Sequence, residues 1–331
     1  MQRKPDLTRR HAVASLVAAP WLLHGTAGRA QDVWPSKPIR YVVTFAAGGS
    51  TSVFSRLLAD PVGKILGQNV WIDNRAGAGG LIGVDNVVKS APDGYSLVMT
   101  AAGPTAIFPA MEGTHVPFDP AKDLSPIVYL SDQPNVLVAH PSVPSANFQD
   151  FVAWCRKNKG EGYATVGVGT TNHVTGEQLS STLGLGLTHV PYKGASPAIL
   201  DLLSGNVKLA ILNIVDAMAN INAGKFKPLF VSTGKRSELL PNTPTIVEVG
   251  GSPYPLNSWQ GMFGPANMPA AIVEKLNAAF NEALKAPAVI DWMKANGSVA
   301  VGGSSEKFRK FVASEQKVWG DLVRKYKIRA E

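Results

Sequence analysis

Short apolar segments typical of β-strands alternate along the chain with longer segments whose apolar residues recur at helical spacing. Residues 40–58 show this pattern most clearly. Residues 41–45 are β-branched or aromatic, as a buried strand requires, and the apolar residues of 53–58 fall on one face of a helix. The residues between them are small or hydroxylated. The segment therefore predicts a strand, a tight loop and a helix.

The same alternation continues through most of the chain. Further strands are expected at residues 70–73, 95–100, 127–130, 136–139, 163–166, 209–213 and 229–232. Helices are expected at the end of the chain, at residues 269–285, 287–295 and 304–325. Residues 250–258 are rich in Gly, Pro and Ser, which favours a change of domain there. The pattern as a whole predicts an α/β protein with two lobes.

The loop in the first of these segments has the composition of an anion-binding turn. Gly48 and Gly49 let a ligand approach the main chain, and Ser50, Thr51 and Ser52 are all good N-cap types. A helix start exposes backbone N–H groups and a partial positive charge, which suits a carboxylate or a phosphate. A Gly-Gly turn that binds nothing remains the alternative at this point.

A loop of similar composition follows the strand expected at residues 163–166. It contains Thr170, Thr171, Asn172 and His173, and Thr171 or Asn172 is expected to cap the next helix. His173 could suggest a catalytic base, but no nucleophile motif accompanies it. Because open α/β sheets bind ligands at the carboxyl ends of their strands, the two loops predict a cleft for a small molecule between the lobes.

The first 30 residues are typical of a targeting segment and are excluded from the fold. Arg3, Lys4, Arg9 and Arg10 precede an apolar core, and cleavage is expected after Ala30. The segment has five basic residues and one acid, so it accounts for +4 of the total charge of +8 and leaves about +4 for the rest. Thr8-Arg9-Arg10 suggests a twin-arginine signal, although the residues that normally reinforce it are absent. The export route therefore stays open.

Several function classes are disfavoured by the composition of the chain. Its 331 residues contain no basic stripe with interleaved aromatics, so nucleic-acid binding is not expected. The glycine run that begins at Gly77 places Ile82 where a dinucleotide fingerprint needs glycine, and there is no Walker lysine. The histidines are not at metal-ligand spacing, so neither a cofactor nor a metal is expected. One cysteine permits no intrachain disulfide.

Longer motifs carry a family resemblance over the whole chain after the targeting segment. They are Trp34-Pro-Ser-Lys-Pro-Ile-Arg, Phe45-x-x-Gly48-Gly49, Val70-x-x-x-Asn74-Arg75-x-Gly77-x-Gly79-Gly80-x-x-Gly83, Ala91-Pro-Asp-Gly-Tyr, Val190-Pro-Tyr-Lys-Gly and Thr243-Pro-Thr. Through these motifs the sequence resembles the Bug/TctC-type substrate-binding proteins of tripartite tricarboxylate transporters. The resemblance implies a periplasmic solute-binding protein that passes a small organic acid, a dicarboxylate or an aromatic carboxylate, to membrane permease subunits.

The resemblance also implies a fold and a set of ligand-binding residues. The fold is similar to type II periplasmic binding proteins, with one lobe at residues 31–132 plus 256–331, the other at 133–255, and a ligand cleft between them. The implied first-lobe contacts are Phe45, Ala47, Gly48, Gly49, Ser50, Thr51, Ser52, Ala102, Gly103 and Thr105. The implied second-lobe contacts are Thr170, Thr171, Asn172, His173, Ala195, Ser196 and Asn213.

One departure from the family pattern bears on the ligand. Members of the family usually have an aspartate shortly after the glycines, where this chain has Ser52. Because that aspartate can receive a ligand's amino group, its loss disfavours an amino acid and favours a plain carboxylic acid. Two other functions remain as alternatives. One is an exported α/β hydrolase that pairs Ser50 or Thr51 with His173, disfavoured because no G-x-S-x-G elbow is present. The other is a ligand sensor for a membrane kinase.

Overall fold

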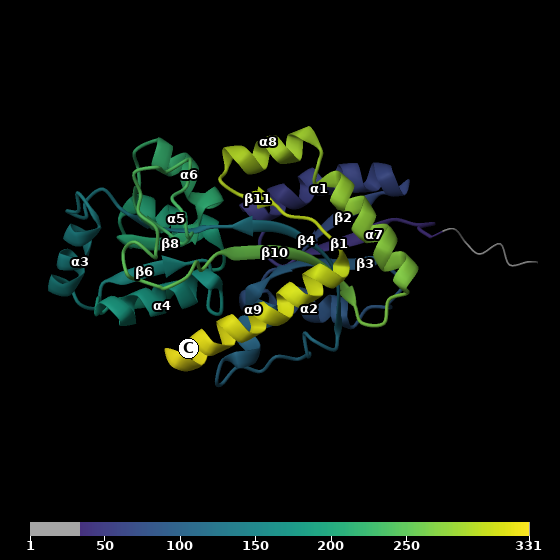
Figure 1. Ribbon diagram of the computed structural model, residues 1–331, viewed down its shortest axis with the longest axis horizontal. Helices are drawn as coiled ribbons and strands as arrows, with labels where there is room; N and C mark the ends of the chain where they lie inside the picture. Colours follow the sequence, from purple (N-terminus) through teal and green to yellow (C-terminus); the bar gives the residue numbers. More distant parts are fainter. Residues whose placement is uncertain (1–33, 331) are drawn as a thin grey trace, which may run out of the picture.

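Two separate β-sheets form the centres of two α/β lobes (Figure 1). The computed structural model of the protein describes residues 34–330. The predicted signal peptide, residues 1–30, and its cleavage site after Ala30 lie outside the described residues. The two-lobe α/β architecture predicted from the alternation of strands and helices is confirmed.

The sheet of the first lobe has six strands in the order β11-β4-β10-β3-β1-β2. They are β1 (Ile39–Val43), β2 (Val70–Asn74), β3 (Ser96–Ala101), β4 (Leu124–Gln133), β10 (Ser258–Pro265) and β11 (Val299–Ala300). Strands β1, β2 and β3 are parallel, whereas β10 is antiparallel to both of its neighbours. The helical segments of this lobe are α1 (Ser50–Leu66), η1 (Ala78–Gly80), α2 (Leu81–Val88), η2 (Gly103–Ile107), η3 (Phe108–Ala110), α7 (Ala270–Ala283), α8 (Pro287–Ala295) and α9 (Ser305–Lys325).

The sheet of the second lobe has five strands in the order β7-β6-β8-β5-β9. They are β5 (Asn135–Ala139), β6 (Gly162–Thr165), β7 (Thr188–Pro191), β8 (Leu209–Asn213) and β9 (Lys227–Val231). Its helices are α3 (Phe148–Lys157), α4 (Thr171–Leu183), α5 (Ala195–Ser204) and α6 (Ile214–Asn222). Strands β6, β7 and β8 are parallel, so the loops after them reach the same edge of the sheet.

The chain passes between the lobes twice. It goes from β4 to β5 through Pro134 and returns in residues 232–257, before β10. Asn135 links the two passages, because its backbone N–H donates to Ser232 Oγ at 2.8 Å and its side-chain Nδ2 donates to the Leu256 carbonyl at 2.9 Å. The exact lobe boundaries given above, 31–132 plus 256–331 and 133–255, stay a prediction.

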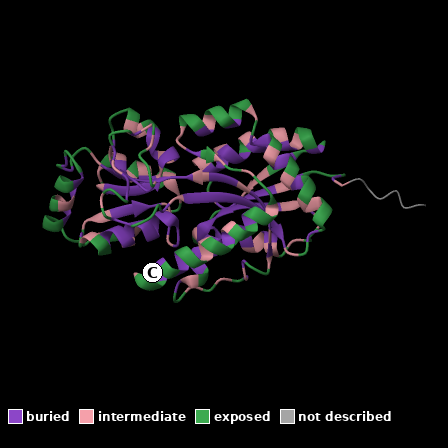
Figure 2. Ribbon diagram, in the orientation of Figure 1, coloured by how far each residue is buried: buried purple, intermediate pink, exposed green. Residues whose placement is uncertain are grey.

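The inner face of α1 anchors this helix to the first lobe. Phe54 and Leu58 are fully buried, and the Phe54 ring stacks on Trp292 of α8 with centroids 5.7 Å apart. Each fully buried side chain of this size contributes about 1.5–3 kcal/mol. The strands are buried while the helices keep an exposed face, as Figure 2 shows. This packing fixes the start of α1 relative to the sheet.

Three details differ from the prediction. The first strand ends at Val43 rather than at residue 45. The residues after β3 are small, which predicts a loop, but they form a buried helical segment, η2. The cap of α4 is Thr170, not Thr171 or Asn172, because the Thr170 side chain accepts a hydrogen bond from the His173 N–H.

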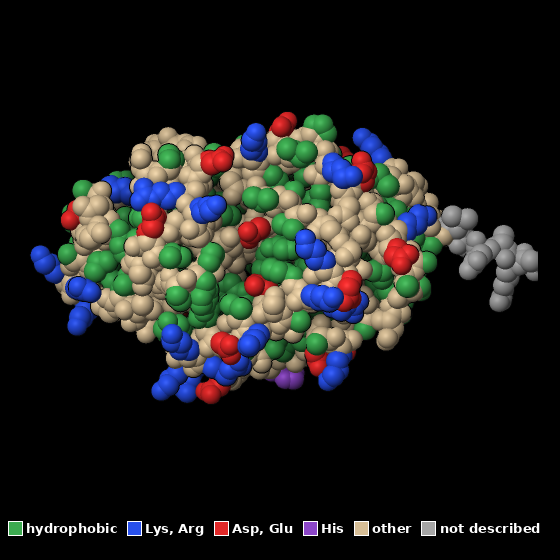
Figure 3. Space-filling view, in the orientation of Figure 1, with side chains coloured by type: hydrophobic (Ala, Val, Ile, Leu, Met, Phe, Trp, Pro, Cys, Tyr) green, Lys and Arg blue, Asp and Glu red, His purple; other side chains and the backbone are tan. Residues whose placement is uncertain are grey.

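On the face that Figure 3 shows, Lys and Arg side chains are interspersed with Asp and Glu.

Candidate functional site

The start of α1 lacks a side-chain cap of its own. Its N-cap residue is Gly49, and the expected hydroxyl caps Ser50, Thr51 and Ser52 instead lie within the first turn of the helix. Gly48, at φ +90°, adopts a conformation that side chains disfavour, so the turn requires glycine there. A start without a side-chain cap leaves backbone N–H groups free to bind another acceptor.

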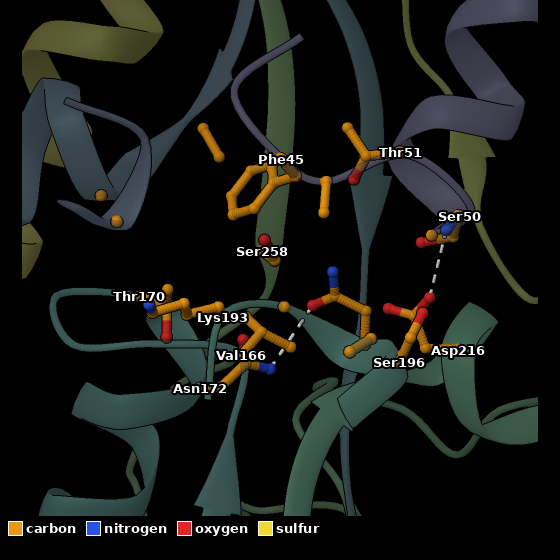
Figure 4. Close-up of a pocket in the computed structure, with 18 of the residues that line it drawn as sticks. Phe45, Ser50, Thr51, Val166, Thr170, Asn172, Lys193, Ser196, Asp216 and Ser258 are labelled. Carbon is orange, nitrogen blue, oxygen red and sulfur yellow. Dashed lines mark hydrogen bonds between the residues drawn. The ribbon is translucent and has the colours of Figure 1, made fainter. Parts of the chain in front are cut away.

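An acceptor for the start of α1 comes from the other lobe. The backbone N–H of Ser50 donates to Oδ1 of Asp216, in the first turn of α6, at 3.3 Å (Figure 4). Asp216 is partly buried. Desolvation raises the pKa of its carboxyl above the ordinary value, and the contacts with Ser50 oppose that rise. Asp216 therefore places a negative charge at the positive end of the α1 dipole, across the gap between the lobes.

Thr51 and Gln260 form a second polar contact on the first-lobe side. Gln260 Nε2 donates to Thr51 Oγ1 at 2.9 Å, and Gln260 Oε1 accepts from Ser131 Oγ at 3.3 Å. All three side chains are buried. The orientation of the Thr51 hydroxyl is thus set by β10 and β4 rather than by the loop that carries it.

The start of α4, unlike that of α1, is capped by a side chain of its own lobe. Thr170 Oγ1 also donates to the Gly167 carbonyl at 2.8 Å, which closes the loop before the helix. Asn172 Nδ2 donates to Asn135 Oδ1 at 2.9 Å and to Asn213 Oδ1 at 3.4 Å, and Asn213 Nδ2 in turn donates to Gln133 Oε1 at 3.3 Å. These side-chain amides fix the residues that the second lobe contributes to the site, here called the second-lobe half-site. They also join this half-site to the first passage between the lobes.

His173, in the first turn of α4, packs against a second buried histidine, His189. The rings of His173 and His189 stack with centroids 3.8 Å apart, and His189 Nε2 lies 2.7 Å from Thr165 Oγ1. The Gly169 N–H donates to His173 Nδ1 at 3.3 Å. Burial lowers the pKa of His173 to about 4, and burial together with the nearby His173 lowers the pKa of His189 to about 3. Both rings are therefore neutral at pH 7.

Two glycines of the first lobe lie close to backbone carbonyls of the second lobe. A Cβ atom on Gly103, in η2, would lie 2.9 Å from the Gly169 carbonyl oxygen of the second lobe. A Cβ on Gly79 would lie 2.8 Å from the Val168 carbonyl oxygen. Side chains at either position would hold the lobes apart, so this arrangement of the lobes depends on glycine.

A cavity between the lobes joins these features (Figure 4). The empty space between its lining residues amounts to about 790 Å³, including space open to solvent. The predicted site residues that line it are Phe45, Ala47, Gly49, Ser50, Thr51, Gly103, Thr170, Thr171, Asn172, Ala195, Ser196 and Asn213. The predicted residues that are not among those lining it are Gly48, Ser52, Ala102, Thr105 and His173.

The five predicted residues that do not line the cavity lie elsewhere in the two lobes. Ser52 and Thr105 are fully buried and hydrogen-bonded, Ser52 to Asn74 and Thr105 to the Ala101 carbonyl. Ala102 is buried in the core of the first lobe, and Gly48 forms the exposed turn before α1. His173 belongs to the stacked pair. Whether any of the predicted residues contacts a ligand stays a prediction.

Sequence reasoning missed several residues of the cavity. The additional lining residues are Ala46, Gly79, Ala101, Pro104, Val166, Lys193, Gly194, Pro197, Asp216, Ser258 and Gln260. Asp216 follows β8 by three residues, so the rule on strand ends could have included it. Ser258 and Gln260 lie at the amino end of β10, which reaches the cavity only because β10 runs antiparallel to β3.

The chemistry available in the cavity is anion binding rather than nucleophilic catalysis. Two helix starts, several hydroxyls and Lys193 line the cavity, and all of these stabilise a carboxylate. Ser50 and Thr51 line it too, but His173 is hydrogen-bonded to the Gly169 N–H and stacked on His189. The Ser/Thr–His pair of the hydrolase alternative is therefore not assembled. Within residues 34–330, no helix has the length and apolar character needed to cross a membrane.

The fold and the cavity define a periplasmic binding protein, and solved structures of that class are similar to this one. A structure of the periplasmic binding protein BugD aligns with a TM-score of 0.85 at 31% identity, over 90% of this chain and all of the other. R. palustris Rpa4515 with adipate aligns at 0.84 and 31% identity, over 89% and 99% of the two chains. MatC from Rhodopseudomonas palustris with bound malate aligns at 0.82 and 29%, over 87% and 99%.

The family model of the tripartite tricarboxylate transporter family receptor, TctC, matches residues 54–328, and the chain belongs to this family. Protein BugT of Bordetella pertussis is 34% identical over 325 residues, covering 96% of this chain and 98% of that protein. The family resemblance expected from the sequence is confirmed, and the protein is a solute-binding receptor, not an enzyme.

Proposed function

We propose that the protein is exported to the periplasm, with its signal peptide cleaved after Ala30, and captures a small organic acid there for the permease subunits of a tripartite tricarboxylate-type transporter. The ligand class is a dicarboxylate or an aromatic carboxylate. The observation that carries this proposal is a cavity that is lined by the starts of both α1 and α4, one from each lobe. A carboxylate held between two helix starts favours the closed form, because only that form offers both.

Thermal unfolding of residues 31–331 with a panel of mono-, di- and aromatic carboxylates tests the binding step. A ligand present at a hundred times its Kd stabilises the folded state by about 2.7 kcal/mol, which raises the melting temperature by several degrees. Calorimetry then gives the Kd of each acid that produces a shift. If no acid of the panel raises the melting temperature, the protein does not bind the proposed class of ligand.

A matched pair of variants on one helix locates the site. Thr171 lines the cavity at the start of α4, whereas Thr182 is exposed near the other end of that helix. We expect Thr171→Val to weaken ligand binding about tenfold, because it removes a hydroxyl that donates to a charged group. Thr182→Val should leave the Kd unchanged. Equal effects of the two variants would place the ligand elsewhere.

Uptake by membrane vesicles that contain the permease subunits tests the transport step. Uptake of the identified acid should require the added protein and should slow severalfold with Thr171→Val when the concentration of the acid is below the weakened Kd. Capture of a membrane kinase instead of permease subunits from the same membranes would support the sensory alternative.

A further inference from the structure

Asp216 is the feature of the cavity that simple capture of a carboxylate does not explain. A carboxylate in the wall of an anion-binding site weakens the binding of the anion, because like charges repel, and burial of the group costs free energy. Yet Asp216 lines the cavity, is partly buried, and faces the start of α1 from the opposite lobe (Figure 4).

The hydrogen bonding of Asp216 is incomplete. In residues 34–330, Ser50 alone is hydrogen-bonded to this carboxylate, through its backbone N–H, 3.3 Å from Oδ1, and a side-chain contact. A carboxylate offers about four acceptor positions. No Lys or Arg of the described chain forms an ion pair with Asp216 either, although twelve such pairs occur elsewhere in it. Most of its acceptor capacity is therefore available to a group in the cavity.

The two sides of the cavity differ in the kind of group they can receive. Thr170 and the start of α4 lie on one side, where no acidic side chain of the described residues lines the cavity, and Asp216 lies on the other side, beside Ser50 and Ser196 (Figure 4). A ligand with a carboxylate at the first side meets Asp216 at the second. A hydrogen-bond donor on the ligand satisfies Asp216, whereas a hydrocarbon leaves it desolvated and unpaired.

We infer that Asp216 is a specificity-determining residue that selects organic acids carrying a hydroxyl or protonated amino group, oriented toward α6, over the unsubstituted acids of the same skeleton. This inference rests on the proposed function and narrows its ligand class. The raised pKa of the Asp216 carboxyl agrees with it, because a donor from the ligand would offset the desolvation that causes the rise. Asp216 would thus supply from the second lobe the carboxylate that the family usually has in the first lobe, where this chain has Ser52.

Matched sets of acids test the selection directly by calorimetry on residues 31–331. The sets are succinate, malate and aspartate; adipate and 2-aminoadipate; and benzoate, 4-hydroxybenzoate and 4-aminobenzoate. We expect a substituted acid of at least one set to bind at least tenfold more tightly than its unsubstituted parent, because a site built to bond a hydroxyl or amine discriminates strongly against its absence. A tighter amino acid identifies the ammonium as the preferred group, and a tighter hydroxy acid identifies the hydroxyl.

Two substitutions then connect the preference to Asp216. Asp216→Ala removes the acceptor, so the preference should fall to within about threefold and the unsubstituted acid should bind more tightly than before. Asp216→Asn keeps the shape and an acceptor oxygen but not the charge, so it should weaken an amino acid more than a hydroxy acid. Asp291→Asn, at an exposed position of α8, is the matched control and should leave every Kd unchanged.

The outcomes separate this inference from the function beneath it. Acids that bind with no preference for a substituent, or a preference that persists in Asp216→Ala, overturn the role of Asp216 and leave the capture of organic acids standing. Failure of every acid in all three sets to bind the unaltered protein overturns the proposed function itself, and the role of Asp216 with it. Circular dichroism of each variant confirms that it is folded before its Kd is compared.

Discussion

The two half-sites that face each other across the cavity are built in different ways. The start of α4 is capped by its own Thr170 and is supported by the side-chain amides around Asn172. The start of α1 has Gly49 as its N-cap, with no side-chain cap, and takes Asp216 from the other lobe as a partner. The second-lobe half is therefore complete within its own lobe, apart from one contact with Gln133, while the first-lobe half is completed only when the lobes meet.

This difference suggests an order of binding. A ligand that meets the open protein finds a preorganised set of donors at α4 and an incomplete one at α1. Preorganised donors cost less conformational entropy to use, so the second lobe should hold the ligand first. Closure then brings α1, Thr51 and Gln260 onto it. The predictions below test the two halves separately, from the largest expected effect to the smallest.

The buried histidine pair makes the second-lobe half sensitive to acid. Because the pKa values of His173 and His189 are lowered to about 4 and about 3, the unfolded chain binds protons below pH 6.5 that the folded protein does not. The stability contributed by these rings is fully present above pH 6.5 and is lost as the pH falls toward 4. We expect His189→Phe, which keeps an aromatic ring beside His173, to reduce this loss by about 3 kcal/mol over that interval.

The measurement is the free energy of unfolding in urea at several pH values. His189→Phe also loses the contact with Thr165, so its stability at pH 7 is expected to be lower, and the slope against pH is the relevant quantity. His115→Gln is the control, since His115 is exposed. An unchanged slope in His189→Phe would mean that the pair does not control acid stability.

The glycine contact between the lobes should govern closure. Gly103→Ala places a Cβ atom 2.9 Å from the Gly169 carbonyl, so the variant must stop short of the present arrangement of the lobes. We expect ligand affinity to fall about tenfold, equivalent to about 1.4 kcal/mol, because the first-lobe half-site no longer reaches the ligand fully. Calorimetry with the identified acid measures this change.

Gly320→Ala on α9 is the matched control for that substitution. It too changes a helical glycine, but the nearest atoms to its Cβ belong to the mobile end of the Arg324 side chain, at 3.3 Å. It should bind ligand normally. If Gly103→Ala also binds normally, ligand capture does not need the lobes to come this close, and the dependence of the first-lobe half on closure is weaker than argued above.

The smallest effect concerns the cap of α4. Thr170→Ala should lower the free energy of unfolding by about 1 kcal/mol, the usual cost of losing an N-cap hydroxyl. Ser304→Ala removes the corresponding cap of α9, far along the chain from the cavity, and should cost about the same. Only Thr170→Ala should also weaken ligand binding. A similar change in Kd for both variants would show that global stability, rather than the half-site, sets affinity.

Much of the fold follows from the sequence because its signals are local. Strand β8 and helix α8 have the bounds that their apolar spacing predicts, and most other predicted elements differ by only a few residues. The loops at the carboxyl ends of the strands follow from the same reasoning, which is why the predicted residues around Ser50 and Thr170 reach one cavity.

The parts that could not be predicted depend on contacts between distant segments. Asp216 is 166 residues from Ser50, so no local pattern connects it to the start of α1. Gln260 reaches Thr51 only through the antiparallel placement of β10. The stacking of His173 on His189 likewise depends on how α4 and β7 pack. These contacts decide the charge and shape of the cavity, and each needs the three-dimensional arrangement to be seen.

Asn135 gives the molecule a mechanical property that neither lobe has alone. Asn135 lies in the first segment that connects the lobes, and its backbone and side chain are hydrogen-bonded to Ser232 and Leu256 in the second connecting segment. Because the two connecting segments are hydrogen-bonded to one residue, we expect the lobes to move relative to each other mainly about that point, through a single opening angle. A ligand that favours one value of this angle therefore sets the position of one whole lobe relative to the other.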